Sequence, residues 1–246
     1  MASALGLRHV WLLNDLEASA HGIDALAPED LLILHPGVAD AAGNAALIAA
    51  GTGLGEAGLY WDGRRHRPFA SEGGHATFAP TTDLETALHA HLRARFGHVS
   101  WERILSGPGL VHLYTFLRAH RRAGEPAWLT EEMAAGDAAA AITRAGLDGR
   151  SPVCSEALDL FVTLYGREAG NLALKLMATG GVYVGGGIAP RIQARLRGPA
   201  FVDAFRAKGR MASLLEAIPV RVILQDAAPL LGAARYAAMA AGGETP

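Results

Sequence analysis

The chain has 246 residues, half of them hydrophobic and 19% charged, with a formal net charge of −2. This composition excludes a disordered chain, and the near-neutral balance provides no basic field for nucleic acid or an anionic membrane. Cys154 is the only cysteine, which excludes an intramolecular disulfide and argues against a cysteine-based zinc site. No apolar run approaches the roughly 20 residues of a membrane span, and no signal-peptide pattern is present. We therefore expect a cytoplasmic protein.

The first part of the chain predicts short strands separated by turns. We expect a buried strand at residues 10–13, followed by a short helix that ends near Gly22. The apolar string LLILHPG predicts a second strand. Residues 45–69 then indicate a strand, a glycine turn, a strand, a hairpin and a further strand. Residues 31–70 should therefore form a β-rich region.

Helical periodicity dominates from residue 82 onward. Thr82 and Glu85 have the spacing of a capping box, and the apolar residues that follow recur on one helix face. Ser100 is expected to cap a short helix that contains Glu102 and ends at the SGPG string. Three more helical segments are predicted at residues 108–117, 129–147 and 151–177.

The last part of the chain returns to strands. GGVYVGGGIAPRI predicts a strand, a glycine turn and a helix, IPVRVILQD a strand, and APLLGAARYAAMAA a closing helix. Strands and helices thus interleave along the chain, which predicts an α/β fold.

Two glycine-rich strings follow predicted strands, where the backbone can approach a ligand closely. GTGLG has three alternate glycines and a threonine hydroxyl, which favours contact with a phosphate, although a plain tight hairpin explains it equally. It matches neither a P-loop nor a dinucleotide fingerprint. GGG in the later string suits a flat ring or a phosphate, or simply a tight connection between strand and helix. The candidate residues are Gly51, Thr52, Gly53, Gly55, Gly185, Gly186 and Gly187.

Asn14 and Asp15 end the first predicted strand, at the kind of position where α/β proteins open their ligand crevices. Asparagine offers a donor and an acceptor, and an aspartate can take a proton from an attacking hydroxyl. The alternative is that Asp15 only caps the helix that follows.

Glu72 and His75 flank two glycines in the string EGGH, which indicates a polar turn, a metal site or a grip on a polyhydroxylated ligand. We expect no metal, because the other histidines lack a matching acidic set. A carboxylate and an imidazole both bond hydroxyl groups, and the glycines would let the backbone turn them toward one ligand. Glu102 is a further acceptor candidate, or else an acid placed in a first helical turn by the helix dipole.

Taken in order, LLND, AGTGLGEA, EGGHATFAP, GHVSWERILSGPGLVHLY, GNLAL and GGVYVGGGIAPR resemble the bacterial glucokinases, members of the actin-like sugar kinase superfamily. The similarity extends from about Val10 to Gly232. It implies an actin-like (ribonuclease H-like) α/β fold. The large domain would occupy residues 26–225, and residues 1–25 and 226–246 would be the remnant of a small domain.

The resemblance also implies an activity, namely transfer of the γ-phosphoryl group of ATP to the 6-hydroxyl of glucose. In that case GTGLG would line the ATP phosphates and GGG would lie by the adenosine, with Mg²⁺ held mainly by phosphates and water. The family further suggests a homodimer. The implied glucose ligands are Asn14, Asp15, Glu72, His75 and Glu102, with Asp15 as the general base.

One motif of the family, the phosphate-binding Asp-x-Gly-Gly-Thr, is absent from the sequence. We therefore expect most of the small domain to be missing. Two interpretations follow: an active glucokinase, and a catalytically impaired glucose-binding relic or fragment. The phosphoryl donor also stays open, because ADP or polyphosphate could use similar glycine turns.

Overall fold

The computed structural model describes residue 6 and residues 9–242 of the chain. The described residues form a six-stranded mixed sheet with the order β1-β6-β5-β2-β3-β4. The central strands β2, β5 and β6 are parallel, and the β2–β3–β4 meander and β1 are antiparallel to their neighbours. The strands are β1 (Leu31–His35), β2 (Ala45–Ala50), β3 (Leu54–Trp61), β4 (His66–Ser71), β5 (Gly181–Gly185) and β6 (Val220–Ile223).

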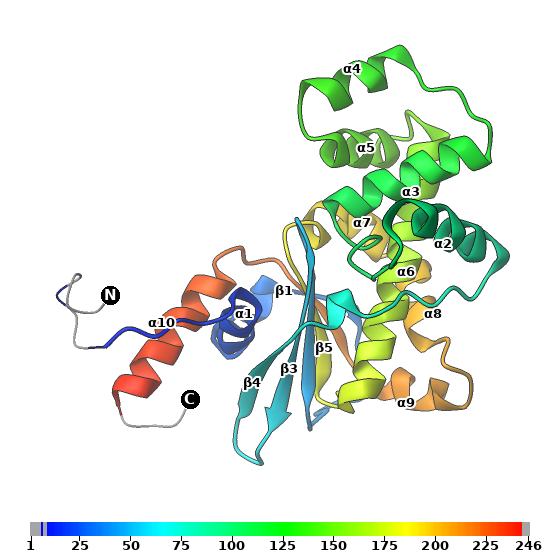
Figure 1. Cartoon of the computed structure of the whole chain (residues 1–246). Helices are drawn as coiled ribbons and strands as arrows, with labels where there is room; N and C mark the ends of the chain where they lie inside the picture. Colours follow the sequence, from blue (N-terminus) through cyan, green and yellow to red (C-terminus); the bar gives the residue numbers. More distant parts are fainter. Residues whose placement is uncertain (1–5, 7–8, 243–246) are drawn as a thin grey trace.

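Helices cover both faces of this sheet (Figure 1). The long helix α6 (Pro152–Leu176) packs on one face, and α8 (Pro199–Arg206) packs against α6. On the other face α1 (Asp15–Gly22) and α10 (Ala228–Ala241) pack against each other. The remaining α-helices are α2 (Asp83–Phe96), α3 (Gly107–His120), α4 (Ala127–Ala135), α5 (Ala138–Leu147), α7 (Gln193–Leu196) and α9 (Ala212–Ala217). The 3₁₀ helices are η2 (Ile23–Ala25), η3 (Pro28–Asp30), η4 (Gly73–His75), η5 (Ala189–Ile192) and η6 (Gly209–Met211).

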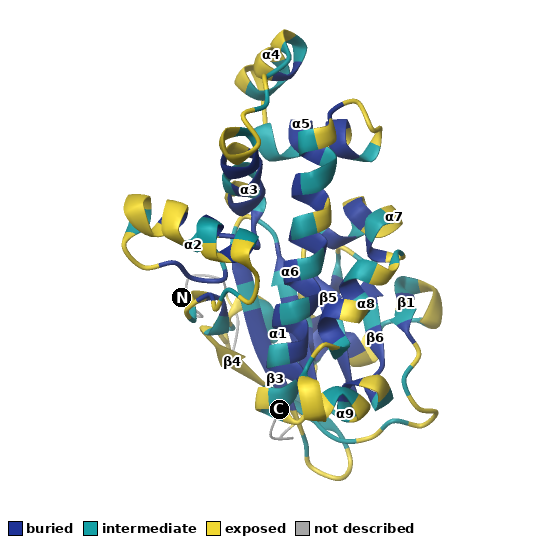
Figure 2. Cartoon of the chain, turned by 90° about the vertical axis from the view of Figure 1, so that its right-hand side faces the viewer, coloured by how far each residue is buried: buried dark blue, intermediate teal, exposed yellow. Residues whose placement is uncertain are grey.

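The core consists of two clusters, one on each face of the sheet. Along β2, Ala46, Ile48 and Ala50 belong to the larger cluster with α6, and Ala45 and Leu47 belong to the smaller one near α1 and α10. Alternate residues of a strand face opposite sides, so a strand covered on both faces is apolar throughout. Figure 2 shows the consequence, with buried residues concentrated in the sheet and α6.

Inside the larger cluster, the Tyr165 hydroxyl of α6 contacts the backbone at the ends of both β2 and β5. Its hydroxyl accepts the N–H of Ala50 at 3.1 Å and lies 3.3 Å from the carbonyl oxygens of Ile48 and Gly185. The carboxyl ends of β2 and β5 are therefore held at the same depth by one buried side chain.

Most predicted elements are confirmed, including the β-rich region, the long helix and the closing helix. The strand predicted at residues 10–13 is wrong. This segment forms no strand, and Leu12 is 93% exposed. A strand needs a hydrogen-bonding neighbour, and β1 and β4, the edges of the described sheet, do not pair with it.

The short helix predicted around Glu102 is also wrong. Residues 101–106 form turns, in which Leu105 N–H donates to the Trp101 carbonyl at 2.8 Å. Ser106 caps α3 instead by accepting the N–H of Gly109 at 3.0 Å, so the SGPG string begins a helix and does not end one.

Two other predicted helices differ in detail. The alanine-rich helix is split into α4 and α5, because the Asp137 carboxylate caps α5 by accepting the N–H groups of Ala139 and Ala140. The capping box at α2 is half formed. Thr82 accepts the N–H of Glu85, but the Glu85 carboxylate accepts the N–H of Thr81.

Among the described residues, no helix combines the length and apolar character that a membrane span requires.

Substitution Tyr165→Phe should lower the free energy of unfolding by about 1–3 kcal/mol, because the ring stays packed while strand-end groups lose a buried partner. Urea unfolding followed by circular dichroism measures the loss. Tyr60→Phe, at an exposed tyrosine of β3, is the matched control and should be nearly neutral. Equal stability of both variants would show that the hydroxyl is dispensable.

Candidate active site

The carboxyl ends of β2, β5 and β6 open into one cavity of about 560 Å³. This is where ligand crevices form in α/β sheets. The cavity is bounded by the first turn of α1, the β2–β3 turn, the η4 loop and the connection after β5. Every site residue predicted from the sequence lines it: Asn14, Asp15, Gly51, Thr52, Gly53, Gly55, Glu72, His75, Glu102, Gly185, Gly186 and Gly187.

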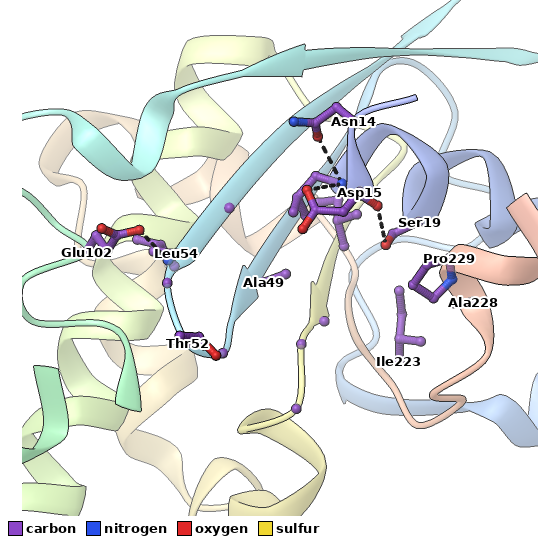
Figure 3. A pocket seen from close by; sticks show the side chains of 18 of the residues that line it. Asn14, Asp15, Ser19, Ala49, Thr52, Leu54, Glu102, Ile223, Ala228 and Pro229 are labelled. Carbon is purple, nitrogen blue, oxygen red and sulfur yellow. Dashed lines mark hydrogen bonds between the residues drawn. The ribbon is translucent and has the colours of Figure 1, made fainter. Parts of the chain in front are cut away.

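Asn14, rather than Asp15, caps α1. The Asn14 Oδ1 atom accepts the N–H groups of Leu16 at 2.9 Å and Glu17 at 3.3 Å. Figure 3 shows Asn14 and Asp15 beside each other at the start of the helix. The prediction that Asp15 is the cap is therefore wrong. Asp15 is the first residue of the helix, and its exposed carboxylate lies at the cavity wall, where Oδ1 also meets the N–H of Leu16.

The EGGH string forms a tight loop that lies directly on β3. The glycines do not need left-handed φ angles; they are needed for close approach. A Cβ at Gly74 would lie 2.0 Å from the Leu54 carbonyl oxygen. The expected role of these glycines, backbone freedom, is thus corrected to packing. The flanking side chains Glu72 and His75 are 83% and 60% exposed, with Oε2 and Nε2 3.8 Å apart.

Glu102 connects the EGGH loop with the glycine turn. Its Oε2 atom accepts the N–H of Leu54 at 3.0 Å, and its own N–H donates to the carbonyl of Gly74 at 2.9 Å. Figure 3 shows this carboxylate beside the start of β3. The helix-dipole interpretation of Glu102 is wrong because the residue lies in a turn.

GTGLG forms the tight β2–β3 hairpin that the sequence allowed. Gly51 N–H donates to the Gly53 carbonyl at 2.8 Å, and the Gly51 carbonyl accepts the N–H of Gly107 at the start of α3. Gly55 is required for a different reason, since a Cβ there would lie 2.3 Å from Leu16 Cδ2. This glycine lets α1, and with it Asp15, lie close to the sheet.

The GGG string makes the tight strand-to-helix connection between β5 and η5. Gly186 has a φ of +80°, and a Cβ there would lie 2.3 Å from the Ala50 carbonyl oxygen. The Gly187 position has open space around it. Gly186 therefore packs against the end of β2, and the backbone at Gly187 stays accessible from the cavity.

Sequence reasoning missed several polar residues of the cavity. Gln225 and Asp226 lie just beyond β6, separated from it by Leu224, and Ser71 ends β4. The argument that singled out Asn14 and Asp15, polar residues after an apolar strand, would have found Gln225 and Asp226 as well.

A second hollow of about 940 Å³ adjoins the first, and Gly51, Thr52 and Gly187 line both. Its walls come from the first turns of α3 and α5 and from η5, with apolar side chains such as Val111 and Ile188.

The fold is that of the actin-like sugar kinases. The structure superposes on a glucokinase from an Antarctic psychrotroph with a TM-score of 0.83 and 36% identity, covering 95% of this chain and 70% of that one. It also matches a ROK family glucokinase from Streptomyces griseus, solved in complex with glucose and AMPPNP. There the TM-score is 0.59 and the identity 22%, covering 95% of this chain and 69% of that one.

The particular family follows from the sequence comparisons. The Glucokinase family model matches residues 1–240. A glucokinase of Synechocystis sp. is 42% identical over 252 residues, covering 97% of this chain and 71% of that relative. The chain belongs to the glucokinase family.

Substitution Gly74→Ala should lower the free energy of unfolding by about 1–3 kcal/mol, because the new methyl group has to displace the loop from the Leu54 carbonyl. Thermal unfolding measures the effect. Gly136→Ala is the control, since nothing lies within 4 Å of its Cβ position. An unfolding temperature of Gly74→Ala equal to that of wild type would refute the packing role.

Proposed function

We propose that this chain transfers the γ-phosphoryl group of ATP to the 6-hydroxyl of glucose. The main observation in support is that five polar residues, far apart in the sequence, line one cavity together with the GTGLG turn. The membership of the chain in the glucokinase family supports the same reaction. The proposed glucose ligands are Asn14, Asp15, Glu72, His75 and Glu102.

The hydrogen bonds already formed within the site support particular roles for individual atoms. Asn14 Oδ1 is occupied by the helix cap, so its amide N–H groups are the part left for a sugar oxygen. Glu102 Oε2 is occupied by Leu54, which leaves Oε1 to accept a sugar hydroxyl. In this scheme sugar binding at Glu102 and the shape of the glycine turn depend on the same carboxylate.

Asp15 is proposed as the general base. Its exposed carboxylate at the start of α1 would accept the proton of the 6-hydroxyl as that oxygen attacks the γ-phosphorus. Because phosphoryl transfer depends mainly on positioning and charge neutralisation, the short contact of α1 with Gly55 matters for the rate.

ATP is proposed to span both hollows. Within the β2–β3 turn the N–H groups of Gly51 and Leu54 are already used, so those of Thr52 and Gly53 are available for phosphate oxygens. The adenosine would occupy the larger, more apolar hollow beside Gly187. The glucose and AMPPNP complex of the Streptomyces griseus protein supports this pairing of ligands.

Mg²⁺ is proposed to arrive with the nucleotide. Among the described residues no three His, Cys, Asp or Glu side chains gather into a possible metal site. The cavity instead offers separate carboxylates at Asp15 and Asp226. Such a donor set suits an ion held mainly by phosphates and water, which when bound neutralises phosphate charge.

The second candidate function is a glucose-binding protein with impaired catalysis. The observation that favours it is the absence of Asp-x-Gly-Gly-Thr from the sequence. ADP or polyphosphate as donor, the homodimer, the cytoplasmic location and the two-domain division at residues 26 and 225 stay predictions. The mutual packing of α1 and α10 supports assigning both helices to one smaller unit.

Substitution Asp15→Asn should lower kcat by about 10²–10⁴-fold and change the affinity for glucose little, because it removes the proton acceptor but keeps a hydrogen-bonding side chain. A coupled assay of glucose 6-phosphate formation measures kcat, and calorimetry measures glucose binding. Glu17→Gln on the same helix, whose side chain is outside the cavity lining, is the control.

The outcomes separate the two candidate functions. Unchanged turnover in Asp15→Asn would overturn the assignment of the base. Heat on glucose binding without product, in the wild-type chain, would support the impaired binder in place of the kinase.

A further inference from the structure

Glu56 of β3 carries a carboxyl group into the core directly beneath the EGGH loop. It is 1% exposed, and its Oε1 atom has no hydrogen-bond partner among the described residues. In the β3–β4 register Glu56 pairs with Ser71, the residue before Glu72. A Cβ at Gly73 would lie 1.9 Å from Glu56 Oε2, so the loop rests on this carboxyl group.

A second buried carboxyl group, that of Glu168 on α6, lies close enough to Glu56 to raise the pKa of that residue. Glu168 has its own partners: Asn171 Nδ2 donates to Oε2 at 2.7 Å, and Lys175 Nζ donates to Oε1 at 3.2 Å. Two carboxylates cannot donate to each other, and their charges repel strongly inside the core. A single proton on Glu56 removes the repulsion and supplies the missing hydrogen bond.

The charged groups around the pair favour this placement of the proton. Lys208 Nζ donates to Asn171 Oδ1 and to the Arg167 carbonyl, and the Arg167 guanidinium pairs with Glu85. Lys208 therefore lies on the side of Glu168, and Arg167 pairs with Glu85. Lys175 is the cation that acts on Glu56, by lowering the pKa of that residue. Tyr165 is the other titratable group of α6 that faces Glu56, while Glu72 and His75 point to solvent.

Burial and the neighbouring Glu168 raise the pKa of Glu56 to about 7. Burial also raises the pKa of Glu168, but Asn171, Lys175 and Lys208 oppose that rise. The proton is therefore held by Glu56, whose Oε1 atom meets no donor among residues 9–242.

We propose that Glu56 is a positioning residue for the sugar-binding loop. In its protonated form its carboxyl group donates a hydrogen bond to Glu168, and the loop packs on the carboxyl group held in this way. Loss of that proton restores the repulsion and pushes the Glu56 carboxylate against Gly73. Glu72 and His75 then move with the loop, and the grip on glucose weakens. The inference rests on the proposed function, since it assumes that this loop binds glucose.

The test is glucose binding by calorimetry between pH 6 and pH 9. In the wild-type chain the affinity should fall by up to about tenfold per pH unit above the pKa of Glu56. In Glu56→Gln the amide donates to Glu168 at every pH, so the affinity should stay near the low-pH value of the wild type. Other pH-dependent contributions to binding are present in both proteins and cancel in the comparison.

Lys175→Met is the second variant, at a side chain that is 53% exposed. Lys175 lowers the pKa of Glu56, so its removal should shift the fall in affinity to higher pH. A merely structural role of Glu56 would not produce this shift. A wild-type affinity that is constant across the range, or a fall that persists unchanged in Glu56→Gln, would overturn the proposal.

A stability measurement separates this proposal from the proposed function. The folded state holds the Glu56 proton more tightly than the unfolded state, so stability should decline as the pH rises from 4.5 to about 7. In Glu56→Gln this decline of the unfolding temperature should be smaller. Absence of glucose binding at any pH, together with the expected stability difference, would refute the glucose site but keep the carboxyl pair. Parallel stability curves would refute the pair itself.

Discussion

The hydrogen bond from the Leu54 N–H to the Glu102 carboxylate is the interaction on which the candidate site depends. It holds the start of β3 against the turn that precedes α3. The N–H of Glu102 binds Gly74, and the N–H of Gly107 binds Gly51, so the EGGH loop and the glycine turn are fixed from the same segment. A hydrogen bond to a carboxylate contributes about 1.5–3 kcal/mol, and the two backbone hydrogen bonds of the same segment add to it.

Close backbone contacts at glycines fix the position of helix α1, which carries Asp15. Helices α1 and α10 cross at two glycines, where a Cβ at Gly232 would lie 1.7 Å from the Ala18 carbonyl oxygen and one at Gly22 would lie 2.2 Å from that of Ala228. Gly55 lets Leu16 of α1 rest on β3. The position of Asp15 at the start of α1 therefore depends on the glycines Gly22, Gly55 and Gly232, which allow this helix to pack closely on α10 and β3.

The buried acids show how the fold combines rigidity with polar chemistry. Glu85 pairs with Arg167 and accepts the Thr81 N–H, and Glu168 pairs with Lys175 and accepts an N–H of Asn171. Within the part of the chain that the structure describes, Glu56 Oε1 has no such partner, which distinguishes it from the other two buried acids. Unpaired buried charge is costly, and a carboxyl group in that situation normally keeps its proton.

The sequence by itself determined the β-rich region, the long helix that Ser151-Pro152 opens and the candidate residues, because strand alternation, helical spacing and glycine turns are local patterns. Only the tertiary structure decided that Asn14 is the cap, that Glu102 lies in a turn and that residues 10–13 form no strand. It also showed that Gly73 and Gly74 are required by packing on β3. These features depend on partners that are distant in the chain, such as Leu54 for Glu102, and no local pattern records which atoms folding will bring within hydrogen-bonding range.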